Sequence, residues 1–208
     1  PAKTEHAQRN LMTDSTPKPG LYYGWYVTAA CLFIAFSMVG TRQAIGVFVV
    51  PMSDDFGWDR TTMSVAVALG VLVNGLTQPP LGYLFDRFGV RVILASLIVV
   101  GLATASLAFT FHILFFAFVF GIVASTALSG ASANNTGALL TRWFRRRRGT
   151  VVGLSGAGSS LGGLVLVPFV AYLMEATNWR VSWIAMGLII LALSAPLAFV
   201  FLRDDPSV

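Results

Sequence analysis

The sequence predicts an all-α integral membrane protein built as a bundle of six transmembrane helices. Of its 208 residues, 56% are hydrophobic and only 11% are charged, and the mean hydropathy is +0.75. Soluble domains are about half apolar and about a quarter charged. The apolar residues form six long stretches, and the basic residues lie mainly in the short segments between them. A bilayer can accommodate this much apolar surface, whereas a water-soluble domain could not bury it.

Each apolar stretch is long enough to cross the hydrocarbon core, which takes about 20 helical residues. The six predicted helices, in chain order, cover residues 22–50, 61–83, 90–111, 113–141, 149–174 and 181–202. They form a predicted bundle over residues 21–203. The polar residues 1–20 lack the apolar core of a signal peptide and are expected to be a cytoplasmic tail. Residues 204–208 are expected to begin a central cytoplasmic linker.

Polar residues and prolines punctuate the predicted helices. An acidic segment, PMSDDFGWDR, separates the first two helices, and its Asp59 is placed to cap the second one. Pro79 and Pro80 are expected to kink the second helix or to end its regular hydrogen bonding. A turn at Phe111 and His112 separates the third and fourth helices.

The distribution of Lys and Arg predicts the orientation in the membrane. If both ends of the bundle are cytoplasmic, the inner segments hold 11 of the 14 basic residues, the outer loops hold Arg60 and Arg180, and Arg42 lies inside a helix. Cytoplasmic loops carry an excess of basic residues. We therefore expect a multi-pass protein of the plasma membrane with both ends of the bundle in the cytoplasm. The same distribution argues against nucleic-acid binding, despite the net charge of +5.

The sequence carries no pattern typical of enzymatic catalysis, redox chemistry or metal binding. Its one cysteine, Cys31, lies in an apolar run, so this chain alone offers neither a disulfide nor a cysteine-rich metal site. It has no Walker-type phosphate loop and no paired carboxylates within the predicted helices. No enzyme activity and no cofactor are expected.

The predicted cytoplasmic loop after the second helix reads GYLFDRFGVR. Gly82 is expected to allow the close approach of a neighbouring helix and Gly89 to form a tight turn, while Asp86 is placed to pair with an arginine or a helix N-terminus. A glycine followed by Asp-Arg four residues later and then by a second glycine resembles the signature of the major facilitator superfamily. The resemblance implies a gating role for Gly82, Asp86, Arg87, Gly89 and Arg91.

The second predicted cytoplasmic loop, RWFRRRRG, continues into a glycine-rich fifth helix, and Gly24-Trp25 opens the first helix. Together these features resemble the monocarboxylate porter and oxalate/formate antiporter branch of the superfamily. The resemblance extends from Tyr22 to Arg203. It implies that the chain is the N-terminal half of a twelve-helix transporter, made of two inverted three-helix repeats. The expected partner is the C-terminal six-helix half.

The basic loop and the fifth helix each have a simple structural interpretation. The four consecutive arginines of the loop are expected to bind the anionic headgroups of membrane lipids and so to anchor it. The glycines of the fifth helix have the spacing that lets helices pack backbone to backbone in lipid, and they are Gly149, Gly153, Gly158 and Gly162.

Arg42 is the first candidate for substrate binding. It lies inside the first predicted helix, roughly 9 Å from the midplane at about 1.5 Å per residue. A charge there is costly unless it faces a wet cavity or a partner, and a guanidinium can donate two parallel hydrogen bonds to a carboxylate. Mammalian monocarboxylate carriers resemble this helix and hold a lysine that aligns with Gln43, so Gln43 is a second candidate. Alternatively, Arg42 extends toward the outer surface or pairs structurally.

The fourth helix supplies further candidates. Ser125, Ser129 and Ser132 are spaced i, i+4 and i+7, on one helix face, and the resemblance implies that helices one and four line the substrate cavity. The three serines are predicted to contact the substrate; alternatively, they only permit close packing or bond to their own backbone. Asn134 matches an asparagine of the porter branch and is expected to act in gating or in packing.

The second helix carries two amides, Asn74 and Gln78, spaced i, i+4 just before the two prolines. They are expected to form hydrogen bonds to the other half of the transporter.

The predicted function is secondary active transport of a small monocarboxylate, such as lactate or pyruvate, by alternating access. Proton symport is favoured, and the titrating group would come from the other half because the predicted helices contain no acid in the membrane interior. The alternative is an organic-anion exchanger of the oxalate/formate type, which would need an internal counter-anion. A non-transporting sensor or assembly subunit with the same fold is an alternative of another class, favoured if the rest of the protein lacks a second six-helix bundle.

Overall fold

The computed structural model describes residues 23–144 and 147–203. Within these residues, six helical segments are long and apolar enough to cross a membrane, which confirms the predicted number of spans. The described chain is helical throughout, and no strand occurs in it. The predicted tail at residues 1–20 and the predicted linker at residues 204–208 lie outside the described residues.

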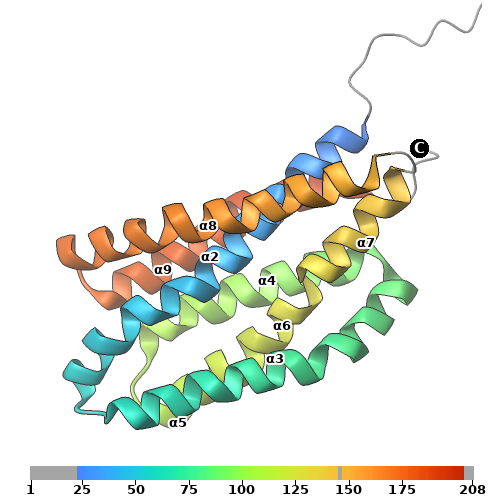
Figure 1. The fold of residues 1–208 in the computed structure, drawn as a ribbon. Coiled ribbons are helices and arrows are strands. Elements are labelled where there is room, and N and C mark those ends of the chain that lie inside the picture. The colour runs from blue at the N-terminus through green and yellow to red at the C-terminus, as the bar shows by residue number, and fades with distance from the viewer. Residues whose placement is uncertain (1–22, 145–146, 204–208) are drawn as a thin grey trace, which may run out of the picture.

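The first three spans run in alternating directions between the two ends of the bundle (Figure 1). They consist of α2 (Gly24–Phe56), α3 (Arg60–Phe88) and α4 (Val90–Ser106), the last extended by the 3₁₀ turn η1 (Leu107–Phe109). The fourth span is divided into α5 (Ile113–Phe116), the π-helical η2 (Ala117–Ala124), α6 (Ser125–Gly130) and α7 (Ala133–Trp143). The last two spans are α8 (Arg148–Ala176) and the sequence α9 (Trp179–Ile189), π-helical η3 (Ile190–Ser194) and α10 (Ala195–Phe201).

Prolines interrupt the first two spans less than the sequence suggests. Helix α2 continues through Pro51 to Phe56, where Gly57 ends it with a left-handed φ of 63° and donates its N–H to the carbonyl of Ser53. Helix α3 likewise continues through Pro79 and Pro80, so these residues do not end the helix, and the predicted kink stays a prediction. Membrane helices tolerate proline because neighbouring helices and polar side chains compensate for the lost hydrogen bonds.

The turns at the helix ends agree in part with the sequence interpretation. Gly89 has a φ of 59°, a conformation that favours glycine, and it forms the predicted tight turn between α3 and α4. Asp59 occupies the N-cap position of α3, but its side chain makes no capping hydrogen bond. At the turn before α5, His112 Nδ1 accepts a hydrogen bond from the backbone N–H of Leu114 at 3.2 Å, so this histidine is a helix cap.

The six spans pair in a way that reflects two inverted repeats. The first span packs most extensively on the fifth, the second on the fourth, and the third on the sixth. A two-fold axis that exchanges spans one to three with spans four to six converts the first pair into the second and leaves the third pair unchanged. In Figure 1, α2 accordingly lies beside α8, and α3 lies beside α6. This arrangement is that of the predicted half-transporter bundle.

Small residues allow the first and fifth spans to touch along their backbones. A β-carbon added to Gly158 would lie 2.5 Å from the carbonyl oxygen of Leu32, and one added to Gly162 would overlap the carbonyl oxygen of Phe36. At Gly149 and Gly153, an added β-carbon would meet nothing within 4 Å. The predicted glycine stripe therefore serves helix packing in its second half only, within the described residues.

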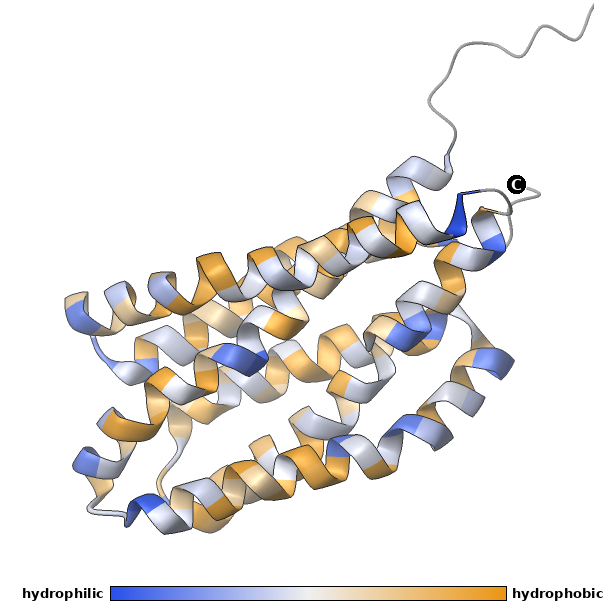
Figure 2. Cartoon of the chain, in the orientation of Figure 1, coloured by the Kyte–Doolittle hydropathy of each residue, from blue (hydrophilic) through white to orange (hydrophobic). Residues whose placement is uncertain are grey.

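The apolar core is divided into two clusters, one toward each end of the bundle. One cluster contains Ile34 and Phe85, and the other contains Phe48 and Trp183, whose rings stack at 3.8 Å. Many large apolar residues outside these clusters are exposed. Figure 2 shows hydrophobic residues along most of each helix and hydrophilic residues at most helix ends, with a few hydrophilic positions within the helices. This distribution is the one that a bilayer requires.

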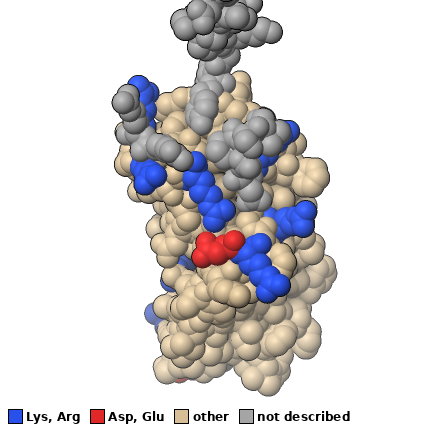
Figure 3. Space-filling model, turned by 90° about the vertical axis from the view of Figure 1, so that its right-hand side faces the viewer, with Lys and Arg blue, Asp and Glu red and all other residues tan. Residues whose placement is uncertain are grey.

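The two ends of the bundle carry different charges. Figure 3 views one end and shows basic side chains grouped around an acidic one. The described helix termini at this end supply six arginines and one aspartate, namely Arg87, Arg91, Arg142, Arg147, Arg148, Arg203 and Asp86. The termini at the other end supply two arginines and four acids, namely Arg60, Arg180, Asp54, Asp55, Asp59 and Glu175. We call these the basic end and the acidic end.

Candidate functional site

A cavity with six polar residues in its wall lies among the helices. It has a volume of about 210 Å³ and is lined by residues of α2, α3, α6, α7 and α8 together with the segment that joins α6 to α7. A second hollow of about 100 Å³ lies beside it and shares Arg42, Asn74 and Leu128 with it. The polar side chains that line the larger cavity are Arg42, Asn74, Gln78, Ser132, Asn134 and Ser159.

Arg42 is placed between the two hollows. It lies near the middle of α2, and its side chain is exposed. Among the described residues, no carboxylate lies within 4.0 Å of its guanidinium and no hydrogen bond to it is formed. A cation inside a membrane helix is tolerated when it faces water or a ligand. Of the two interpretations left open by the sequence, the cavity therefore agrees with the first, in which Arg42 faces a polar space.

The fourth span is broken where it borders the cavity. Ala131 and Ser132 separate α6 from α7, and Ser132 has the extended conformation φ −66°, ψ 160°. The buried amide of Asn135 supports this break, because its Nδ2 donates to the carbonyl oxygen of Gly130 at 2.9 Å. The break means that Ser125, Ser129 and Ser132 do not share one continuous helix face, contrary to the sequence expectation.

The break directs the start of α7 toward the cavity. Ala131, Ser132, Ala133 and Asn134 all line it. The first N–H groups of a helix have no acceptor within the helix and carry a partial positive charge. The hydroxyl of Ser132, at the N-cap position, makes no capping hydrogen bond. The α7 N-terminus and Arg42 thus border the same space, and both favour an anion.

A chain of amides crosses the cavity wall from α3 to α7. Asn74 Nδ2 donates to the carbonyl oxygen of Ser125 at 3.0 Å and to the hydroxyl of Ser129 at 2.8 Å. Gln78 Nε2 donates to Asn74 Oδ1 at 3.4 Å, and Asn134 Nδ2 donates to Gln78 Oε1 at 3.3 Å. Asn74 and Gln78 therefore form hydrogen bonds within this bundle.

The predicted substrate-binding residues separate into three groups. Arg42 and Ser132 line the larger cavity, and Ser125 lines the smaller hollow, where its hydroxyl donates to the carbonyl of Phe120 at 2.8 Å. Ser129 is only 1% exposed, and its hydroxyl bonds to α3, as the alternative packing interpretation predicts. Gln43 lines neither hollow, because its side chain lies against Gly163 of α8.

Four further polar residues belong to the cavity wall but were not among the predicted substrate-binding residues. Asn74, Gln78 and Ser159 were missed, and Asn134 was assigned to gating or packing. The i, i+4 spacing of the two amides on α3 was the available signal for the first two. Ser159 carried no comparable signal, since it lies in a run of small residues.

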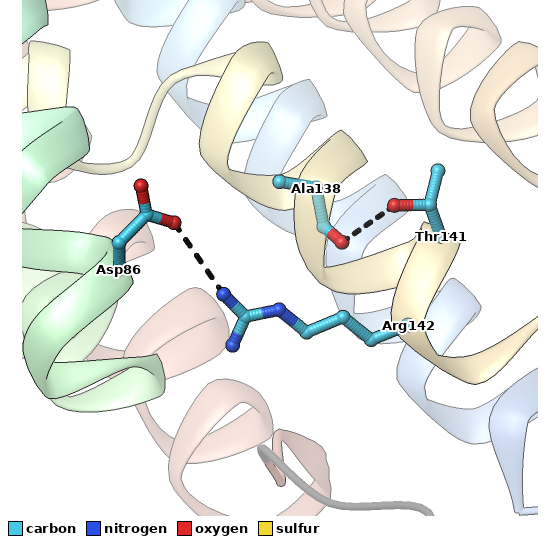
Figure 4. Close-up of polar contacts among 4 residues, drawn as sticks. All are labelled: Asp86, Ala138, Thr141 and Arg142. Carbon is cyan, nitrogen blue, oxygen red and sulfur yellow. Dashed lines mark hydrogen bonds and ion pairs between the residues drawn. The ribbon is translucent and has the colours of Figure 1, made fainter.

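Apart from Asn134, which lines the cavity, the predicted gating residues lie at the basic end. Asp86 Oδ1 lies 3.5 Å from Arg142 Nη2, so the acid joins the end of α3 to the end of α7 (Figure 4). The hydroxyl of the neighbouring Thr141 donates to the carbonyl of Ala138 within α7, so it is not the residue that contacts Asp86. The guanidinium of Arg142 also lies 5.2 Å from the centre of the Phe85 ring. The acid thus pairs with an arginine of the same bundle.

The other residues of this loop have separate environments. The guanidinium of Arg87 lies 5.5 Å from the centre of the Phe88 ring. Arg91 lies at the start of α4 and lines an apolar groove. A β-carbon added to Gly82 would meet nothing within 4 Å, so no contact among the described residues requires glycine there, contrary to the expected close approach.

Comparison with known proteins finds relatives of this chain among membrane transporters. The chain is 28% identical over 204 residues to monocarboxylate transporter 11 of Mus musculus, and this alignment covers 92% of this chain and 44% of that protein. It is 22% identical over 179 residues to the oxalate:formate antiporter of Oxalobacter formigenes, which covers 85% of this chain and 42% of the antiporter. It is also 25% identical over 183 residues to an uncharacterized MFS-type transporter of Bacillus subtilis, with coverage of 88% and 45%.

The chain therefore spans about half the length of these curated relatives. The profile of the Major Facilitator Superfamily matches residues 10–208, nearly the whole chain. With its six membrane-spanning helices, paired as in inverted repeats, this chain belongs to the Major Facilitator Superfamily.

Proposed function

We propose that this chain is the N-terminal half of a secondary active transporter that moves a small monocarboxylate, such as lactate or pyruvate, by alternating access. The observation that carries the proposal is the position of Arg42, which has no acidic partner among the described residues and borders the same cavity as the start of α7. A guanidinium and free backbone N–H groups are the donors that a carboxylate accepts.

The size and polarity of the cavity favour a small substrate. Its volume of about 210 Å³ leaves room for several water molecules. This space suits a compact organic anion with a few waters. The amides of Gln78 and Asn134 and the hydroxyl of Ser132 can accept or donate hydrogen bonds to the remainder of the substrate. The names of two relatives, monocarboxylate transporter 11 and oxalate:formate antiporter, also refer to small carboxylates.

Alternating access requires a second bundle, which we place in the part of the transporter outside this chain. The cavity lies between the two half-bundles in this scheme, at the level where transporters of this type hold their substrates. The Asp86–Arg142 pair, with Gly82, Arg87 and Gly89 near it, would take part in closing the cytoplasmic side. The basic end is then cytoplasmic and contacts anionic lipid headgroups of the plasma membrane.

Proton symport is the coupling that we propose, with a proton carrier outside this chain. The acids of the described residues lie only at the two ends of the bundle, and the cavity is lined by no acid. Exchange of two organic anions is a second candidate, favoured by the similarity to the oxalate:formate antiporter. The two modes differ in whether uptake needs a pH gradient or an internal anion.

The test is uptake of radiolabelled lactate by liposomes that contain the full-length transporter. We expect an inward proton gradient to drive uptake, Arg42→Ala to abolish it, and Gln43→Ala to leave it largely intact, because Gln43 lies against α8. Uptake that needs internal oxalate or lactate but no gradient would indicate exchange. No uptake of lactate under either condition would contradict the proposed substrate, and normal uptake by Arg42→Ala would contradict the proposed site.

A further inference from the structure

We propose that the side of this bundle holds one anionic phospholipid at a defined site near the basic end. The phosphate would bind Arg91, and an acyl chain would lie in the groove beside it. The site is distinct from the substrate cavity. The groove has a volume of about 550 Å³ and lies between α3, α4 and the η2–α6 part of the fourth span. Most of its lining side chains are apolar.

The groove has the polarity of a lipid, with a charge at one end and apolar residues below it. Arg91 is the second residue of α4, at the basic end, where the helices leave the membrane interior. From Arg91 to Val99, the α4 wall descends about 12 Å at 1.5 Å of rise per residue. The rim consists of side chains that are exposed in the bundle, namely Leu84, Phe88, Val99 and Ile122.

Arg91 is available to an external anion. The ion pair formed by the described residues is the one between Asp86 and Arg142, and no described carboxylate lies within 4.0 Å of Arg91. Its side chain is exposed. A guanidinium at the interface attracts anionic lipid and donates hydrogen bonds to phosphate oxygens. A zwitterionic or neutral lipid would fill the apolar groove equally well but would gain less from this charge.

The groove and the substrate cavity are lined by different residues of α3 and of the fourth span. Leu128 lines the cavity whereas Thr126 lines the groove, and two residues along a helix correspond to about 200° of rotation. On α3, the cavity is lined by Asn74 and Gln78 and the groove by Leu84 and Phe88, nearer the basic end. The proposal requires that a second bundle that covers the cavity leaves the groove open to lipid.

The test is lipid retention by the purified full-length transporter, measured by native mass spectrometry in the presence of phosphatidylglycerol or phosphatidylcholine. Wild-type protein is expected to retain one phosphatidylglycerol in preference to phosphatidylcholine. Arg91→Gln is expected to weaken this binding about fivefold, the effect of removing one surface arginine that attracts anionic lipid. Ala95→Phe is also expected to remove the lipid, because Ala95 is exposed and lines the groove, so that a larger side chain fills it.

Two variants serve as matched controls and are expected to retain the lipid. Arg147→Gln removes an exposed arginine at the same end, outside the groove, and Ile98→Phe enlarges an exposed side chain of α4 outside the groove. If Ala95→Phe does not give a monodisperse protein, Ala95→Leu replaces it.

Several results would overturn the proposed site. Equal losses in Arg91→Gln and Arg147→Gln would mean that lipid is attracted by the general charge of this end. Equal retention of phosphatidylcholine would remove the role of the headgroup. Displacement of the lipid by excess glycerol phosphate, with no effect of Ala95→Phe, would indicate a site for a free anion. A dimer that dissociates in Ala95→Phe would mean that a second copy of the protein occupies the groove.

Discussion

Gly162 of α8 lies so close to the carbonyl oxygen of Phe36 in α2 that a β-carbon at residue 162 would overlap that oxygen. The contact is reciprocal one turn further on, where a β-carbon at Gly40 of α2 would lie 2.8 Å from the carbonyl oxygen of Gly162. Arg42 follows Gly40 by two residues. The first and fifth spans therefore interlock close in sequence to the arginine of the proposed substrate site.

Gly162→Ala is expected to destabilise the bundle. The added methyl group would push α2 and α8 apart, and overpacking of this kind typically costs about 1–3 kcal/mol. We expect a decrease of a few degrees in the midpoint of thermal unfolding in detergent. Gly156→Ala, on the same helix, is the control, because an added β-carbon there meets nothing within 4 Å. An equal decrease for both variants would contradict the interlocked contact.

Neutralising either member of the Asp86–Arg142 pair is expected to change transport more than stability. The side chains of Arg142 and Asp86 are 39% and 75% exposed, and exposed ion pairs contribute about 0–1 kcal/mol to folding. If the pair forms in only one of the two access states, its loss shifts the equilibrium between these states by up to about 1 kcal/mol, which is about fivefold. Asp86→Asn and Arg142→Gln should alter uptake to this extent, with little change in the unfolding midpoint.

The double variant tests whether the two residues act together. We expect Asp86→Asn with Arg142→Gln to resemble either single variant, whereas Asp86→Asn with Arg87→Gln should show additive effects, because Arg87 lies on the Phe88 ring. Additive effects in the first pair would contradict a functional ion pair. The effect should also shrink at 1 M salt, where the Debye length is about 3 Å.

The sequence was sufficient to predict the spans but not the position of the break in them. Hydropathy located all six, because a bilayer demands long apolar segments. Pro79 and Pro80 suggested an interruption of α3, yet that helix continues, and the break occurs at Ala131 and Ser132, which carry no such signal. The break is supported by a local hydrogen bond from Asn135 to the carbonyl of Gly130. It also lies at a close contact with α4, where a β-carbon added to Gly130 would overlap the hydroxyl of Ser96, and local propensity does not encode this tertiary contact.

The candidate site was predictable in its charge and less so in its polar wall. An arginine inside an apolar span indicates a functional position by itself, and Arg42 indeed borders the cavity. The choice between Arg42 and Gln43 needed the structure, since adjacent residues face directions about 100° apart on a helix. Asn134 was expected to act in gating or in packing, whereas it lines the cavity at the start of α7.

Asn74→Ala is expected to lower both the stability and the apparent affinity for substrate. It removes hydrogen bonds to Ser125 and Ser129 and the acceptor for Gln78. Hydrogen bonds between membrane helices contribute about 0.6 kcal/mol on average, so the loss should be about 1–2 kcal/mol. The KM for uptake should rise because Gln78, in the cavity wall, is no longer held.

Thr77→Val is the matched control for this variant. The hydroxyl of Thr77 lies 2.9 Å from that of Ser129 but forms no hydrogen bond with Gln78. We therefore expect a small decrease in the unfolding midpoint and an unchanged KM. A KM that rises equally in both variants would mean that Gln78 is not positioned by Asn74.

Asn134 and Asn135 are adjacent, but only the alanine variant of Asn135 is expected to lower the stability. Asn135 is buried, and its amide binds the carbonyl of Gly130, so Asn135→Ala leaves this carbonyl unsatisfied at a cost of about 1–3 kcal/mol. Asn134 is exposed to the cavity, and its amide binds Gln78 at 3.3 Å. Asn134→Ala should therefore raise the KM for uptake and leave the midpoint of thermal unfolding nearly unchanged.

Thermal unfolding and uptake kinetics measured on both variants separate the two roles. Asn135→Ala should lower the unfolding midpoint, and the protein that remains folded should also lose affinity if the break directs the start of α7 toward the substrate. A decrease in stability for Asn134→Ala with an unchanged KM would exclude it from the substrate site. An unchanged affinity in Asn135→Ala, despite a lower midpoint, would show that the broken fourth span supports the fold but does not orient the substrate.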